Sequence, residues 1–476
     1  MSTPASPARK PLHPGAARRP WLLGVTLAVA VALAAGGVIL SGRFGQCRSA
    51  WDQDYYHLRV VRQFAAELWT PDLSEYRSAT TPGYHLALAA ASRAIGDGER
   101  AMRLAGLLFS AGLVCTLGWA LARRTSCLVA LALAAPCLCS TYVFGSAAWV
   151  TPDNAGWWGV LGVVLTAWAR KVDARAAVVG GIVLAALVLC RQIHLWTAGV
   201  LVLGAWIRAE KPGGIPELER EPPGPRASRA MIALACAIPA VLIVAGFARL
   251  WGGLVTPMFQ AGGLDPVLNQ TTPRNQGGNP AAPALVFALA GVYGVFFSGF
   301  AWGALRRAMR GEWRARLSVG LSMGVAFLAC ALPRTGYDYD AGRRGALWNV
   351  AARFPAPGGR SVLVLALGVL GGAVLGLFFA SLSRRQRWLW LWTWVLFMLT
   401  QAASLTAFQR YIEPFVLMLL ALGASRITPA PMGPVAPSDA PARDGSANRA
   451  PWAAAGPSLL ALGLAAVTVL SLGRDN

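Results

Sequence analysis

Charged side chains are scarce in this chain of 476 residues. Asp, Glu, Lys and Arg together make up only 13% of it, against roughly a quarter in an ordinary soluble domain. Hydrophobic residues make up 55%, and the mean hydropathy is +0.49. A soluble core cannot bury that much apolar surface at this length, so the composition excludes a single water-soluble globule. The same apolar content excludes an intrinsically disordered chain.

Acidic residues and lysine are especially rare. There are 21 Asp and Glu against 43 Lys and Arg, which gives a formal net charge of +22, and the only lysines are Lys10, Lys171 and Lys211. Such basicity can indicate nucleic-acid binding. Here, however, the basic residues cluster between long apolar runs, as membrane topology demands. We therefore expect a lipid bilayer as the partner, and no nucleic acid.

Several signatures of cofactor and metal chemistry are missing. The chain has no P-loop motif, no GxGxxG and no HExxH. Its eight cysteines lie almost entirely within apolar runs, without a CxxC or a paired Cys/His spacing. We expect small buried thiols, with no disulfide framework and no zinc site. No cofactor and no metal ligand is predicted.

Long apolar runs dominate what is present. A membrane-spanning helix needs about 20 mostly apolar residues, and the segment 176–207 is too long for one straight span, so we divide it near Arg191. The resulting fold class is an all-α polytopic membrane protein with about 12–13 transmembrane helices. The other runs are 21–40, 103–122, 127–147, 154–169, 230–251, 283–304, 317–333, 361–382, 388–407, 411–426 and 453–472.

The basic residues also predict an orientation. The tail 1–20 is basic, and we expect an uncleaved first span with a cytoplasmic N-terminus. Alternate connections then carry most of the Lys and Arg, while the short connections between them carry almost none. Two long loops, 42–102 and 334–360, would face outward within a core of residues 21–427. A Pro-rich cytoplasmic linker, 428–452, would precede a last helix and tail, 453–476.

The first long loop holds the candidate acids. Asp52 and Asp54 follow the first span, where an ionised carboxylate could act as a general base toward an acceptor hydroxyl. The alternative is helix capping, since Ser49 and Asp52 have capping-box spacing. His57 could orient a carboxylate or contact a phosphate, or be an ordinary loop histidine. An amphipathic helix around 58–68 and a second helix, 82–96, opened by Thr81 and Pro82, are expected here.

Cationic groups are expected on the same outer side. Arg191, followed by Gln192, lies at the outer end of a hairpin of spans and could pair with phosphate oxygens, or could snorkel to the interface. Asp153 is either a substrate-side carboxylate or a helix N-cap. The remaining candidates have a solvated loop as their alternative: Asp340, Arg343, Arg344, Arg410 and Tyr411.

The order of these motifs resembles a known family. Seven segments resemble, in the same order, the conserved stretches of the α-1,2-glucosyltransferases that add the terminal glucose to the dolichol-linked N-glycan precursor. In that family the stretches read DE-aromatic-His, TTPPGLY, YTD, RQTNIIW, GDKSNH, DNRHYTFYIW and RYFILP. Here they correspond to Asp52–His57, Thr80–Tyr84, Thr151–Asp153, Arg191–Trp196, Gln276–Pro280, Asp340–Trp348 and Arg410–Pro414.

This resemblance implies a GT-C glycosyltransferase, a multi-helix membrane enzyme that takes a sugar from a polyprenyl phosphate. It implies that an acid of the first outer loop is the base, and that Thr81, Tyr84 and the polar groups above contact substrate. The sequence departs from the family at the DE pair, which is Gln53-Asp54 here with Asp52 one place earlier. His194 replaces the expected Asn, and the GDKSNH region retains little beyond Gly and Asn.

The expected activity is transfer of a hexose, glucose by the resemblance, to a hydroxyl of a lipid-linked or cell-envelope glycan. The Ala, Arg and Gly bias favours a bacterial chain, so the site would lie on the outer face of the inner membrane. Asp54, or failing that Asp52, would be the base in an inverting reaction. The alternative is a transporter of a polyprenyl-linked sugar, which would use the same cationic cavity without breaking a bond.

Overall fold

Helices make up nearly all of the part of the chain that the computed structural model describes. That part comprises residues 19–42, 48–208, 223–260, 264–265, 270–271, 277–427 and 450–473. Most of the basic tail, most of the Pro-rich linker and Gln276 lie outside it. Within it the strands form only two-residue pairs, β1 (Leu264–Asp265) with β2 (Gln270–Thr271) and β3 (Arg343–Arg344) with β4 (Ala407–Phe408). The all-α fold is confirmed.

Among the described residues, seven helical segments are long and apolar enough to cross a membrane, so the protein is a polytopic membrane protein. A strongly bent pair, α6 (Cys127–Leu138) and α7 (Thr141–Ala148), would make an eighth span. The seven are α1 (Pro20–Ser41), α5 (Glu99–Ala122), α11 (Pro223–Trp251), α13 (Ala282–Phe297) continued by η3 (Ser298–Ala301) and α14 (Trp302–Met309), α15 (Trp313–Ala331), α17 (Val362–Ser381) and α20 (Ala450–Gly473).

The expected count of 12–13 spans is met only in part. The other expected spans are helices that are too short, or, for α18, too polar, to meet the same test. The break expected near Arg191 is present, because α9 ends at Cys190 and α10 begins at Thr197. These helices are α8 (Asp153–Ala167), α9 (Ala174–Cys190), α10 (Thr197–Trp206), α18 (Arg384–Ala402) and α19 (Glu413–Ile427).

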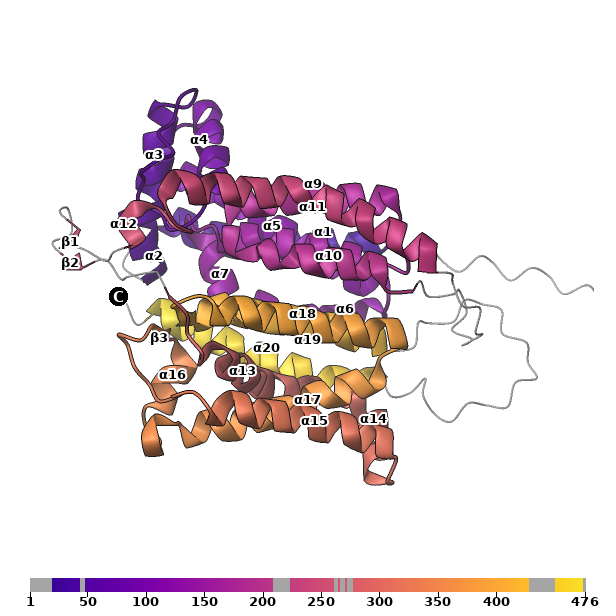
Figure 1. The fold of residues 1–476 in the computed structure, drawn as a ribbon. Coiled ribbons are helices and arrows are strands. Elements are labelled where there is room, and N and C mark those ends of the chain that lie inside the picture. The colour runs from indigo at the N-terminus through magenta and orange to yellow at the C-terminus, as the bar shows by residue number, and fades with distance from the viewer. Residues whose placement is uncertain are drawn as a thin grey trace, which may run out of the picture.

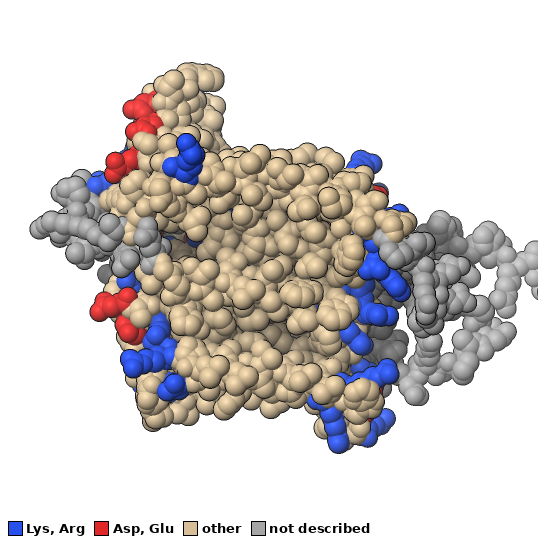
Figure 2. Space-filling model, viewed as in Figure 1, with Lys and Arg blue, Asp and Glu red and all other residues tan. Residues whose placement is uncertain are grey.

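The long helices lie side by side, with their ends at two opposite faces of the bundle (Figure 1). Figure 2 shows a broad uncharged belt between these faces. Large apolar side chains are exposed on the helices, among them Leu33 at 72%, Leu108 at 70% and Ile182 at 66%. In water such a surface would be unstable, whereas lipid tails are as apolar as the side chains themselves. In the same view, arginines dominate one end, and acids and arginines mix at the other.

Glycines let the helices of the C-terminal half approach closely. A Cβ on Gly371 of α17 would lie 1.9 Å from the carbonyl oxygen of Phe287 on α13, and one on Gly291 would lie 2.1 Å from that of Leu367. On another side of α17, a Cβ on Gly372 would meet the Ser322 carbonyl of α15 at 2.5 Å. Small residues that allow backbone contact are the usual means of helix association in lipid.

The loops at the end where acids and arginines mix contain several short helices and strands. The first loop holds α2 (Arg48–Asp52), the π-helical turn η1 (Gln53–His57), α3 (Leu58–Ala66) and α4 (Gly83–Ile95). The parallel pairing of β3 with β4 brings the loop 334–360 against the turn that precedes α19. The remaining short elements are η2 (Gln192–Trp196), α12 (Pro257–Gln260), α16 (Ala346–Ala351), η4 (Pro357–Gly359) and η5 (Gln409–Tyr411).

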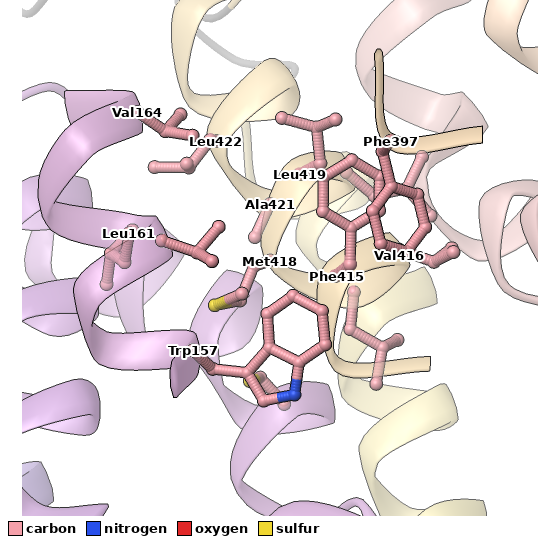
Figure 3. Close-up of a cluster of buried hydrophobic side chains, with 14 of the residues drawn as sticks. Trp157, Leu161, Val164, Phe397, Phe415, Val416, Met418, Leu419, Ala421 and Leu422 are labelled. Atoms are coloured by element: carbon pink, nitrogen blue, oxygen red, sulfur yellow. The ribbon is translucent and has the colours of Figure 1, made fainter. Parts of the chain in front are cut away.

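An aromatic cluster joins the two halves of the chain beneath these loops. Phe397 of α18 and Phe415 of α19 stack with ring centres 3.7 Å apart, and Trp157 of α8 packs against both (Figure 3). All three side chains are buried. They fix α8 against α18 and α19, and these are the elements that border the polar groups described next.

Candidate functional site

Two arginines from opposite halves of the chain contact the ring of one tyrosine. The guanidinium carbon of Arg191 lies 4.6 Å from the centre of the Tyr411 ring, and that of Arg410 lies 4.8 Å from it. Arg410 Nη2 also donates a hydrogen bond to the Tyr411 hydroxyl at 2.6 Å. Cation–π contact at these distances holds both guanidiniums against the ring. The structure thus brings together three residues that the sequence placed on one side of the membrane.

Each of these arginines forms an ion pair with an acid. Arg191 pairs with Asp153, and Arg410 pairs with Asp52. The four side chains are only 9% to 28% exposed. The Nε atoms of both arginines are buried and have no hydrogen-bond partner among the described residues. We call Arg191, Arg410, Tyr411, Asp52 and Asp153 the arginine cluster. Its two Nε–H groups are donors without a partner in the described part of the chain, directly beside the two carboxylates.

Local backbone features explain how these groups meet. Arg191 has extended backbone angles, which end α9, and Asp153 begins α8. One turn into α8, a Cβ on Gly156 would lie 3.0 Å from both Arg191 Cδ and His194 Nε2. The glycine leaves room for these two side chains beside the helix. Asp52 is the last residue of α2, and Arg410 and Tyr411 lie in η5.

Asp52 and Asp54 occupy different environments. Asp52 is buried and faces Arg410, whereas Asp54 is exposed. Asp54 Oδ1 accepts a hydrogen bond from the side-chain amide of Gln53 at 2.8 Å, and the same amide donates to Glu99 at 3.0 Å. The carbonyl oxygen of Gln53 accepts from Arg103 at 2.9 Å. Gln53 is thus a fully buried link between Asp54 and the start of α5.

His57 belongs to a buried histidine pair. Its Nδ1 lies 3.0 Å from Nε2 of His85 on α4, and the rings stack with centres 5.2 Å apart. Burial, reinforced by the charges of Arg410 and Arg191, lowers the pKa of His57 to about 3. Burial likewise lowers the pKa of His85 well below its usual value. Both imidazoles are therefore neutral at physiological pH, and His57 borders the arginine cluster without adding charge to it.

Thr81 and Gln192 bind each other. The Gln192 carbonyl oxygen accepts from the Thr81 backbone at 3.0 Å, and the Thr81 hydroxyl donates to the Val188 carbonyl at 2.6 Å. The Gln192 amide donates to the carbonyls of Ala79 and Leu254, both at 2.8 Å. These contacts attach the first loop to the C-terminal end of α9. In this structure both residues are engaged in holding the backbone that carries Arg191.

Tyr84 is buried at the beginning of α4, near Asp153. Burial, with a smaller contribution from the Asp153 charge, raises the pKa of Tyr84 well above its usual value. Its ring packs against Phe109 at 5.3 Å. A Cβ on Gly106 would lie 3.0 Å from its hydroxyl. The tyrosine therefore lies in a small hydrophobic core, with Leu88 and Met102, that joins α4 to α5.

Of the three candidate residues in the second loop, 334–360, only Arg344 borders the arginine cluster. Arg344 lies 3.7 Å from the Tyr339 ring centre and 5.2 Å from that of Phe408, and Phe408 stacks on Tyr411. Arg344 therefore borders the cluster through an aromatic side chain. Arg343 instead donates to the Gly336 carbonyl at 2.6 Å, within its own loop. Asp340 is exposed on the loop surface.

A buried carboxylate was missed by the sequence analysis. Glu413, at the start of α19, is 2% exposed and accepts hydrogen bonds from Ser140, Tyr293 and Gln409. The available signal was a single acid inside the apolar run 411–426, since ionisable residues at such positions usually have a function. His85 was also missed as the partner of His57.

The described residues contain no group of three or more His, Cys, Asp or Glu side chains arranged to hold a metal ion. Comparison with known proteins finds no matching family model, no significantly similar curated sequence and no significantly similar solved structure. The assignment of a function therefore depends on the residues themselves.

Proposed function

We propose that the protein is a glycosyltransferase of the GT-C type. It would transfer a hexose, glucose in the simplest case, from a polyprenyl phosphate to a hydroxyl of a lipid-linked or cell-envelope glycan. The polar cluster would lie at the outer face of a bacterial inner membrane. The arginine-rich end seen in Figure 2 supports this orientation, because cytoplasmic connections are enriched in Lys and Arg.

One observation carries the proposal: the guanidinium groups of Arg191 and Arg410 meet at the Tyr411 ring, at one end of an apolar bundle. Guanidinium groups bind phosphate oxygens through paired N–H donors. A polyprenyl phosphate has its apolar tail in the bilayer and its phosphate at the surface. Of the ligands that fit such a cluster, a lipid-linked phosphate matches both the charge and the depth.

The chemistry follows from the ion pairs. The donor phosphate would pair with Arg191 and Arg410 in place of Asp153 and Asp52. Asp52 would then be unpaired beside the sugar. The acceptor hydroxyl would lose its proton to Asp52 and form a bond to the anomeric carbon. The bond from that carbon to the phosphate oxygen would break, and its electron pair would stay on the phosphate, whose charge the arginines stabilise. Attack opposite to the leaving group gives inversion.

We assign the base to Asp52 and not to Asp54. The base must reach the hydroxyl that attacks a carbon attached to the bound phosphate. Asp52 contacts Arg410, whereas Asp54 is exposed and tied by Gln53 toward Glu99. The preference for Asp54 that family spacing suggested is replaced by Asp52 on this geometry.

The test is turnover by purified protein in nanodiscs. Undecaprenyl-phosphate-glucose would be incubated with a lipid and glycan extract of the host, and acceptor-dependent release of undecaprenyl phosphate would be followed. We expect Asp52→Asn to lose at least about a hundredfold in rate, within the range for removal of a general base, and Asp54→Asn to stay within about threefold. Full activity of Asp52→Asn would reject this base. Tight donor binding without release, for glucose, mannose and arabinose donors, would favour the transporter.

A further inference from the structure

A buried polar network surrounds Glu413, one turn below Arg410. Its Oε1 accepts a hydrogen bond from the Ser140 hydroxyl at 2.6 Å. Its Oε2 accepts from the Tyr293 hydroxyl at 2.6 Å and from the Gln409 side-chain amide at 2.8 Å. The carboxylate is 2% exposed, and its described partners are all neutral donors.

The network joins three parts of the chain. Ser140 lies at the bend between α6 and α7, where the helix axes differ by 74°. Tyr293 is on α13, and Gln409 begins the turn that carries Arg410 and Tyr411. A carboxylate has about four acceptor positions, so one group can collect donors from three elements. Leucine at this position could collect none.

Gln409 connects Glu413 to the turn that contains Arg410 and to the second loop. Its amide nitrogen donates to Glu413, and its carbonyl oxygen accepts the backbone N–H of Leu347 at 2.8 Å. Gly345 has φ +134, and a Cβ there would lie 2.5 Å from Gln409 Cβ, so the second loop packs directly on this side chain. Fixing Gln409 therefore fixes the backbone of Arg410 and the strand pair β3–β4 together.

We infer that Glu413 is a positioning residue for donor binding: through Gln409 it sets where Arg410 and Tyr411 meet Arg191. This deepens the proposed function and rests on it. The carboxylate does not reach the substrate. Its role is to hold a turn from the C-terminal half against arginine and acid groups of the N-terminal half, where both halves must meet for the phosphate site to exist.

The first experiment separates hydrogen bonding from charge. Glu413→Gln keeps an acceptor for Gln409, and the Ser140 hydroxyl can rotate to accept from the new amide. Glu413→Leu leaves the buried hydroxyls of Ser140 and Tyr293 without this acceptor, and leaves the Gln409 amide with only the Tyr293 hydroxyl, at 3.3 Å. We expect Glu413→Leu to weaken binding of undecaprenyl phosphate by about tenfold or more, and to raise KM for the donor more than it lowers kcat. Glu413→Gln should stay within about threefold. Ser425→Ala, on the same helix, is the matched control.

The second experiment exchanges the pair. Gln409→Glu alone places two carboxylates against each other and should weaken binding as strongly as Glu413→Leu. In the double variant Gln409→Glu, Glu413→Gln, one amide again faces one carboxylate. We expect this exchange to restore at least half of the lost binding free energy. A general loss of folding would not be repaired by moving one charge by a single turn.

The outcomes distinguish the two proposals. If wild type binds no undecaprenyl phosphate, the proposed function fails, and the exchange is then scored by thermal unfolding, where the double variant should melt above Gln409→Glu. If wild type binds the lipid and Glu413→Leu binds it equally well, the positioning role is rejected. A double variant no better than Gln409→Glu, in binding and in melting, also rejects it.

Discussion

Each guanidinium of the cluster already has a carboxylate partner, Asp153 for Arg191 and Asp52 for Arg410. A bound phosphate must compete with those carboxylates. Affinity for a phosphate and stability of the empty protein are therefore opposed at this site. Removing one acid frees an arginine for the ligand, but leaves a largely buried positive charge without its partner, which is destabilising.

Asp153→Asn tests this opposition. We expect binding of undecaprenyl phosphate to tighten severalfold, because one negative charge is removed beside the phosphate. The midpoint of thermal unfolding should fall, because the Arg191 side chain is only 9% exposed. Lipid titration and melting of the same preparation measure both effects, with exposed Asp97 changed to Asn as the control. A variant that binds more weakly and melts lower would show that Asp153 supports the site only structurally.

Gln192 gives a second prediction at this scale. Gln192→Leu removes the hydrogen bonds to Thr81, Ala79 and Leu254, of which those to Thr81 and Ala79 are partly buried, and leaves these backbone groups without their partner. We expect a loss of about 1–3 kcal/mol in the free energy of unfolding, measured by denaturant titration in detergent. Arg62→Ala, on the exposed face of α3, should change it by less than about 0.5 kcal/mol. If Gln192→Leu unfolds like wild type, Gln192 is available for substrate, as the family resemblance implies.

Residue types alone could not divide the candidates into these roles. Arg191, Arg410, Asp153 and Asp52 were recognised from charge next to apolar runs, and they do meet. Thr81 and Gln192 have the same polarity, yet their bonds are to backbone, and only the path of the loop over α9 decides that. Hydrogen bonds between residues more than a hundred positions apart leave no local pattern in the sequence.

At the scale of elements, helix contact in the C-terminal half depends on missing side chains. Gly371 and Gly291 bring α17 and α13 into backbone contact. Gly320 on α15 has no atom within 4 Å of where its Cβ would lie. The sequence shows both as glycines inside apolar runs. Which glycines are contact points depends on the rotation of each helix about its axis.

Gly371→Ala and Gly320→Ala form a matched pair. The Gly371 Cβ would lie 1.9 Å from the Phe287 carbonyl oxygen, so α13 and α17 must separate. We expect the melting midpoint of Gly371→Ala to fall by several degrees, since overpacking costs about 1–3 kcal/mol. Gly320→Ala should be neutral or slightly stabilising, because alanine is the better helix former. Equal effects of the two variants would contradict this packing.

The histidine pair between η1 and α4 makes stability depend on pH. The pKa of His57 is lowered to about 3, and burial lowers that of His85 as well. In the unfolded chain both histidines bind a proton as the pH falls through about 6.5, whereas in the native state they stay neutral at that pH. Stability is therefore full above that pH and falls as the pH drops through 6.5 toward about 3. Each histidine adds up to about 1.4 kcal/mol per pH unit in that window.

Melting at pH 7.5 and pH 5.0 measures this dependence. Wild type should melt at a lower temperature at pH 5.0, and the double variant His57→Gln, His85→Gln should show a clearly smaller shift between the two pH values. The comparison is made between shifts, so any constant loss of stability in the variant cancels. An unchanged shift would mean that other groups set the acid sensitivity.

At the scale of the whole molecule, composition and hydropathy were enough to predict the class of protein. The apolar belt and the helical content follow from runs such as 21–40 and 361–382, which form α1 and α17 almost to the residue. The count of spans was less accurate. Helices such as α10, with 10 residues, are held by packing on α8, α11 and α18, so their length need not match a bilayer. Hydropathy along the sequence does not report packing between helices.

The sidedness of the bundle can be tested directly. Glu75 lies exposed in the first loop, and Arg310 lies exposed between α14 and α15, at the opposite end of the bundle. In a background with Cys47 and Cys127 changed to Ser, a cysteine would be placed at one position or the other. Because Lys and Arg concentrate on the cytoplasmic side, we expect a membrane-impermeant maleimide to label Glu75→Cys in intact spheroplasts. Arg310→Cys should be labelled only after the membrane is opened. The reverse pattern would place Asp52 and Arg410 in the cytoplasm, where an outer-face transfer reaction could not use them.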